Sequence, residues 1–175
     1  MNPGFSPAAT RVLVAVAAWH VVAFAYIVAH LLYNGYLPPQ FFHFPDDSFA
    51  DFFHTTYWAY HDERYTEWMA VHPPLVFAVG QLISLKECFL FEGIAARDGC
   101  GIFSMYVMLA VSMAAAYLNA RLFSENPAVR FLCFVTIATS FPFLHAVERG
   151  NYVLFAYAFL VFAVSTKNRL ADGFF

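Results

Sequence analysis

The sequence predicts an all-α protein: a polytopic membrane helical bundle of about four transmembrane helices and one long exoplasmic loop with short interfacial helices. Of its 175 residues, 61% are hydrophobic and only 12% are charged, whereas soluble domains carry about 25% charged residues. Four largely apolar stretches carry no charge over 17 to 22 residues, which is the length needed to cross a bilayer. Half of the acidic residues gather at 34–74, directly after the first of these stretches. We therefore expect a single membrane domain over residues 1–175.

The uncharged runs locate the spans. They predict transmembrane helices over residues 12–33, 99–120, 129–147 and 150–166. The first run is too long for the apolar region of a cleavable signal peptide, so we interpret it as an uncleaved span. Pro142 predicts a kink in the third span, since proline removes a helical hydrogen bond.

A fifth apolar segment, residues 75–85, is too short to cross the membrane. Eleven residues rise about 16 Å as a helix, against a hydrocarbon core of roughly 30 Å. We expect a half-membrane helix near 74–91 that enters one leaflet or lies along the interface. The alternative, a fifth span reaching Phe91, would bury Lys86 and Glu87, which is costly.

The distribution of basic residues gives the orientation. With four spans, five Lys and Arg residues flank the spans on one face, which is then cytoplasmic by the positive-inside rule. These residues are Arg11, Arg121, Arg130, Lys167 and Arg169. The loop 34–98 and the turn at Glu148–Arg149 fall on the exoplasmic face, and both chain ends on the cytoplasmic one. With five spans the basic residues divide almost evenly between the faces, and the rule gives no orientation.

Charge and cysteine content exclude other classes. The formal net charge of −3 argues against a nucleic-acid partner. The three cysteines, Cys88, Cys100 and Cys133, show no CxxC spacing, so we predict neither a disulfide framework nor a zinc site. The expected location is a membrane, with membrane lipids as surroundings.

The loop 34–74 has an unusual composition for a linker. It holds six of the twelve acidic residues, four of the seven histidines and twelve of the 35 aromatic residues. Disordered segments are poor in aromatic residues, so we expect a folded loop against the membrane surface. Asp47 or Ser48 is a candidate N-cap for a helix over 49–60.

Three interpretations of the acidic loop remain open from the residues alone. One carboxylate can act as the general base on a sugar or lipid hydroxyl. Alternatively, a divalent metal site can form if Asp46, Asp47, Asp51 and His54 converge, although no ligand signature is present and we predict no resident cofactor. The third interpretation is a solvated acidic loop without a chemical role.

The order of several short motifs resembles a known enzyme family. The run Asp-Ser-Phe-Ala-Asp-Phe-Phe-His-Thr-Thr-Tyr-Trp-Ala over 47–59 is followed by Tyr-Thr-Glu-Trp at 65–68 and His-Pro-Pro-Leu at 72–75. Glu-Arg-Gly-Asn at 148–151 opens the last apolar run. Together these resemble GT-C class membrane glycosyltransferases, and most of all the bacterial polyprenol-phosphate-mannose-dependent α-mannosyltransferase-like proteins.

The resemblance covers residues 40–166 and implies an activity. It implies transfer of a hexose, mannose in that family, from a polyprenyl-phosphate sugar to a lipid or glycan acceptor on the exoplasmic face of a bacterial plasma membrane. It makes Asp51 the general base, with Asp46 and Asp47 as reserve candidates. Members have more spans than four, so the chain corresponds to their N-terminal part. His72 stands where the family usually has tyrosine, and Arg-Gly-Asn-Tyr lacks a second asparagine.

Further residues are expected around the donor. Arg149 begins the last span and supplies positive charge for a phosphate, and the amides of residues 150–152 add the positive end of a helix dipole. The remaining candidates are Glu148, which would orient Arg149, Asn151, His72, His145 and, for sugar or lipid contacts, Tyr57, Trp58 and Tyr65. The rival hypothesis is a non-enzymatic membrane component, such as an assembly or transporter subunit.

Overall fold

The computed structural model describes residues 6–41, 47–90 and 100–172, and every regular element in these ranges is a helix. The elements are α1 (Pro7–Asn34), α2 (Ala50–Ala59), η2 (Asp62–Tyr65), α3 (Pro74–Ile83), η3 (Lys86–Phe89), α4 (Cys100–Phe123), α5 (Pro127–Ala138), α6 (Phe141–Arg149) and α7 (Val153–Asp172). The all-α prediction is confirmed for the described part of the chain.

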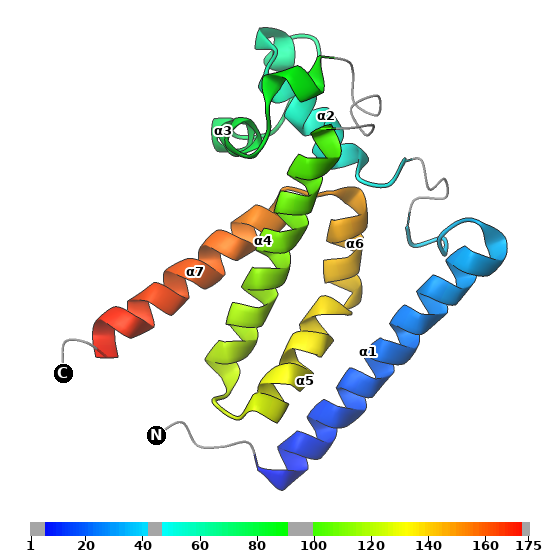
Figure 1. Ribbon diagram of the computed structural model, residues 1–175, viewed down its shortest axis with the longest axis vertical. Coiled ribbons are helices and arrows are strands. Elements are labelled where there is room, and N and C mark those ends of the chain that lie inside the picture. Colours follow the sequence, from blue (N-terminus) through cyan, green and yellow to red (C-terminus); the bar gives the residue numbers. More distant parts are fainter. Residues whose placement is uncertain (1–5, 42–46, 91–99, 173–175) are drawn as a thin grey trace.

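The long helices lie side by side in one row. α4 packs against α7 and α5, and α5 packs in turn against α1, so the order across the molecule is α7, α4, α5, α1. The N-terminal end of α1 and the C-terminal end of α7 lie at the lower edge of this row, and α2 and α3 lie at its upper edge (Figure 1).

Local sequence signals set the ends of these helices. The Ser6 side chain accepts a hydrogen bond from the amide of Ala9 and caps α1, which ends at Gly35 in the left-handed conformation. Asn126 caps α5 in the same way, with Pro127 at the first helical position. α5 and α6 meet at a bend of 52°. The bend falls where Pro142 has no amide hydrogen to donate to the preceding turn, as the sequence predicts.

In the part of the chain that the structure describes, two helices are long and apolar enough to cross a membrane: Pro7–Asn34 and Gly101–Phe123. The bent pair α5–α6 counts as a third if it forms one span, and Val153–Thr166 is a shorter apolar helix. A membrane protein is therefore consistent with the structure. The count of four spans stays a prediction.

The apolar segment 75–85 forms only a short helix. α3 ends at Ile83, and Ser84 is extended, so no continuous helix runs toward Phe91. Cys88 of η3 is disulfide-bonded, whereas Cys133 is free. Our expectation that the cysteines form no disulfide was wrong for Cys88, because spacing along the chain does not report distance in space.

The core lies where the loop helices meet the long ones. Phe52 and Phe53 of α2, Phe89 of η3 and Met108 of α4 are almost fully buried and pack in one region with Tyr152. The loop is thus anchored to the helical row, which fixes the position of its polar side chains.

Candidate functional site

The N-terminus of α2 docks on the turn between α6 and α7. Phe49 precedes α2 in the left-handed conformation, with φ of 63°, and its amide donates to the carbonyl of Glu148 at 2.6 Å. Gly150 also has a positive φ, of 66°, and a Cβ built there would lie 2.6 Å from the Cβ of Phe52. Only glycine permits both this conformation and this approach.

This docking brings Asp51 to Arg149. The guanidinium donates from Nε to Asp51 Oδ2 at 3.0 Å and from Nη2 to Oδ1 at 3.3 Å. Asn151 Nδ2 donates to Oδ2 at 3.4 Å. The hydrogen bond with Asp51 raises the pKa of Arg149 above its ordinary value. The side chains are 37% exposed for Arg149 and 33% for Asp51, so solvent and ligands reach the pair.

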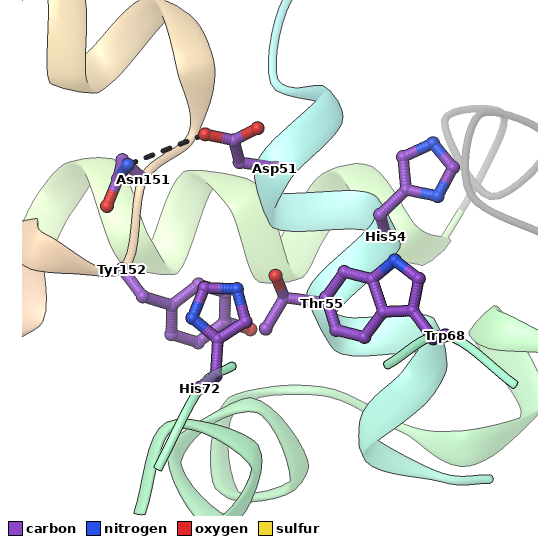
Figure 2. A pocket seen from close by; sticks show the side chains of 7 residues that line it. All are labelled: Asp51, His54, Thr55, Trp68, His72, Asn151 and Tyr152. Atoms are coloured by element: carbon purple, nitrogen blue, oxygen red, sulfur yellow. Dashed lines mark hydrogen bonds between the residues drawn. The ribbon is translucent and has the colours of Figure 1, made fainter. Parts of the chain in front are cut away.

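An open pocket of about 390 Å³ lies beside the ion pair. Its walls come from α2, from the segment before α3 and from the turn before α7 (Figure 2). The lining residues are Asp51, His54, Thr55, Trp68, His72, Asn151 and Tyr152. It combines a carboxylate with imidazole, indole and amide groups, which suits a polar ligand with an apolar face.

Buried hydrogen bonds connect two of the elements that line the pocket. Thr56 Oγ1 donates to the carbonyl of Phe52 at 2.7 Å. Since a threonine hydroxyl has one hydrogen, the hydroxyl of Tyr152 donates to Thr56 Oγ1, also at 2.7 Å. The ring of Tyr152 stacks on that of Phe52. α2 and the turn before α7 are therefore joined by both polar and aromatic contacts.

Aromatic side chains form the opposite wall. The ring of Trp68 stacks on Trp58, with 5.9 Å between centroids and 3° between planes. His72 lies 5.6 Å from Trp68, and Phe77 of α3 packs against both. These contacts hold the indole and the imidazole at the edge of the pocket.

The structure brings together part of the predicted site. Asp51 and Arg149 are in contact, and Asn151 and His72 line the same pocket as Asp51. Trp58 lies one ring away, stacked behind Trp68. Asp46 lies outside the described residues.

Other predicted residues lie elsewhere. Tyr57 stacks on His61, Tyr65 packs against Phe77, and His145 stacks on Phe141 of α6. None of these three lines the pocket, and neither does Asp47.

Glu148 precedes Arg149 in the chain, and its charge contributes to the raised pKa of Arg149. The side chain of Glu148 is buried and lines a separate apolar pocket between α1 and α6. Asp51 is in direct contact with the guanidinium, and the orienting role expected of Glu148 stays a prediction.

Two local expectations at this site were wrong. Neither Asp47 nor Ser48 caps α2: Phe49 is the N-cap residue and provides no side-chain hydrogen bond. The amides of Gly150 and Asn151 are not directed at a ligand, since they donate to the carbonyls of Val147 and Ala146 in α6.

Three pocket residues were not among the predicted site residues: Thr55, Trp68 and Tyr152. His54, a fourth pocket residue, was considered only as a metal ligand. A signal existed for Thr55 as well as for His54. Asp51, His54 and Thr55 are spaced i, i+3 and i+4, which puts them on one face of α2. Trp68 and Tyr152 depend on how the loop folds back, for which no local pattern exists.

Within residues 6–41, 47–90 and 100–172, no three His, Cys, Asp or Glu side chains gather in a group that could hold a metal ion. The cluster of Asp47, Asp51 and His54 is therefore not assembled in the described part of the chain. Comparison of the chain with protein-family models, with curated proteins and with solved structures found no match.

Proposed function

We propose that the chain is a membrane glycosyltransferase that transfers a hexose from a polyprenyl-phosphate sugar to a lipid or glycan acceptor. Mannose and the exoplasmic face of a bacterial plasma membrane follow from the family resemblance. The observation that carries the proposal is the contact between Asp51 and Arg149, 98 residues apart in the chain, beside an open pocket. Such a reaction needs a cation for the phosphate and a carboxylate for the acceptor proton.

Arg149 is suited to hold the donor phosphate. A guanidinium binds phosphate and carboxylate through the same fork of two N–H groups. The pair with Asp51 is about one-third exposed, and exposed ion pairs contribute only about 0–1 kcal/mol. A phosphate therefore displaces Asp51 from Arg149 at a low cost in free energy. The hydrogen bond from Asn151 to Asp51 is kept in this exchange.

Asp51 is suited to accept the acceptor proton. A carboxylate has about four lone-pair sites, and Arg149 and Asn151 use three of them. In the proposed step the acceptor hydroxyl oxygen bonds to the anomeric carbon and its proton passes to Asp51. The bond from that carbon to the phosphate oxygen breaks, and polyprenyl phosphate leaves with the electron pair. Trp68 and His72 line the space for the sugar.

The placement of the site on the exoplasmic side has separate support. Cys88 is disulfide-bonded, and disulfides persist in oxidising compartments. α2 and α3 also lie at the edge of the helical row opposite to the N-terminal end of α1 and the C-terminal end of α7 (Figure 1). Both observations agree with the orientation expected from the basic residues.

The first test replaces the proposed base. In native membranes, Asp51→Asn should lower the rate of mannose transfer from polyprenyl-phosphate mannose by at least about a hundredfold, at unchanged protein abundance. Asp62→Asn is the matched control, because Asp62 is an exposed loop carboxylate that pairs only with Arg64 in the described contacts. Near-normal transfer by Asp51→Asn would show that Asp51 is not the general base. Loss of transfer in Asp47→Asn instead would assign that role to Asp47.

A charge exchange separates chemistry from structure. The double variant Asp51→Arg with Arg149→Asp keeps an ion pair between the same two positions, and the partial exposure of both side chains leaves room for the exchange. If the pair is only structural, the double variant recovers what each single variant loses. We expect recovery of thermal stability without recovery of transfer, because the base and the cation have changed places.

The second candidate is a non-enzymatic assembly or transporter subunit, and one observation favours it. In the apolar window of α1 only 6% of residues are buried, and large side chains such as Trp19 and Leu32 are exposed. Such a helix can pack against another membrane protein as well as against lipid. In that case the Asp51–Arg149 pair is a structural contact, and the exchanged variant keeps full function.

A further inference from the structure

The exposed face of α3 is apolar at helical spacing. Leu75, Ala78 and Leu82 follow one another on α3 at i, i+3 and i+7, Leu85 follows just after the end of the helix, and all four are exposed. The leucines are 67%, 83% and 65% exposed. Two leucines on one face of the ten-residue helix and a third just beyond its end form an exposed apolar patch, which is unfavourable in contact with water.

The opposite face of α3 is already packed. Phe77, Val79 and Gly80 are buried, and α3 contacts α2 along this side. The Gln81 side chain donates to the carbonyl of Ala59, the last residue of α2. α3 therefore cannot turn its leucines inward without breaking its contacts with the loop.

α3 lies across the direction of the long helices. Figure 1 views α3 nearly end-on beside the upper end of α4, whereas α4 runs along the length of the picture. A helix in this orientation is parallel to the surface of a membrane that α1 and α4 cross. Ten residues span only about 15 Å, so α3 cannot itself cross the bilayer.

The leucine patch continues onto the surface of α4. Leu82 and Leu85 line a shallow apolar recess together with Phe103, which is 69% exposed in the first turn of the candidate span Gly101–Phe123. Lys86 and Glu87 follow at once and are exposed. An apolar patch that joins the lipid-facing side of a span and ends in charges matches the boundary between acyl chains and headgroups.

We infer that α3 is an in-plane membrane anchor, whose leucine face lies among the acyl chains of the leaflet next to the pocket. The occupant of the face is lipid. This inference depends on α1 and α4 crossing the membrane and does not rest on the proposed glycosyl transfer.

The anchor fixes the depth of the pocket. His72, a pocket wall, precedes α3 by two residues, and Phe77 packs against the rings of both His72 and Trp68. With α3 in the leaflet, the pocket opens at the level of the headgroups. A ligand attached to a lipid then reaches the pocket without leaving the membrane.

The test measures where α3 lies. A nitroxide is attached at Leu82→Cys or Leu75→Cys in the full chain carrying Cys133→Ser, under non-reducing conditions that keep the disulfide of Cys88. Glu67→Cys is the control, an exposed position of the same loop. In phosphatidylethanolamine–phosphatidylglycerol vesicles, we expect both leucine positions to collide several-fold more with oxygen, and several-fold less with a water-soluble nickel chelate, than position 67.

Two results overturn the inference. If positions 75 and 82 collide with the nickel chelate as often as position 67, the leucine face lies in water. If both are shielded from oxygen and from nickel, protein covers the face instead of lipid. A circular dichroism spectrum matching that of the Cys133→Ser parent establishes that each labelled variant is folded.

Discussion

Tyr152 connects the pocket with the packing beneath it. Its ring lies on Phe52, its hydroxyl donates to Thr56, and it lines the same pocket as Asp51. Gly80 of α3 leaves room for that hydroxyl, since a Cβ there would lie 2.9 Å from it. One side chain thus sets the spacing of α2, α3 and the turn before α7.

Tyr152→Phe should lower the free energy of unfolding by about 1 kcal/mol. The change leaves the aromatic stack in place and removes one buried hydrogen bond, whose net contribution is about 0.5–1.5 kcal/mol. Thermal unfolding in detergent measures the change. Tyr65→Phe is the control at an exposed tyrosine, and equal stability of the two variants would contradict the assigned bond.

Arg149→Lys should raise the KM for the lipid-phosphate donor about tenfold. Lysine keeps the charge but lacks the planar fork that contacts two oxygens at once, and the loss of one charge-assisted hydrogen bond is about 1.4 kcal/mol, or tenfold. Steady-state kinetics with varied donor measures it. Arg64→Lys is the control, because Arg64 pairs with Asp62 and lies over Phe77. An unchanged KM would show that Arg149 does not bind the donor.

Among the elements, α2 shows what local sequence can and cannot predict. The sequence predicts a helix over 49–60, and the structure has Ala50–Ala59. The predicted caps failed because Phe49 takes a left-handed conformation and bonds to Glu148, a residue of α6. A contact between segments about a hundred residues apart overrides the local capping preference, and no pattern around residue 49 encodes it.

Gly150→Ala tests the docking of α2 on the α6–α7 turn. The left-handed conformation costs a non-glycine residue about 1–2 kcal/mol, and the new Cβ meets Phe52 at 2.6 Å, where overpacking adds about 1–3 kcal/mol. Gly35→Ala is a matched control, with φ of 77° and no atom within 4 Å of its Cβ. We expect a loss of stability larger by at least about 1 kcal/mol for Gly150→Ala, measured by thermal unfolding. Equal losses would mean that α2 does not dock as described.

At the scale of the whole molecule, the uncharged runs predict where the long helices lie, but the predicted spans are shorter than the helices. The first span was predicted over 12–33 and the helix is Pro7–Asn34, because Arg11 ends the run while helical hydrogen bonding continues to the Ser6 cap. α4 similarly extends past Arg121 to Phe123. The order of helices in the row and the walls of the pocket depend on packing between distant segments, which hydropathy does not contain.

The orientation in the membrane is the last prediction, and it joins the site to the basic residues. If both chain ends are cytoplasmic, the loop with Glu67 is exoplasmic and the turn with Glu125, between α4 and α5, is cytoplasmic; both residues are exposed. In a Cys133→Ser chain with the Cys88 disulfide intact, an impermeant maleimide should label Glu67→Cys in intact cells. It should label Glu125→Cys only after permeabilisation, because α4 separates the two positions by one crossing of about 30 Å. Labelling of position 125 in intact cells would overturn the four-span arrangement, and failure to label position 67 would place Asp51 and Arg149 on the cytoplasmic side, away from an exoplasmic acceptor.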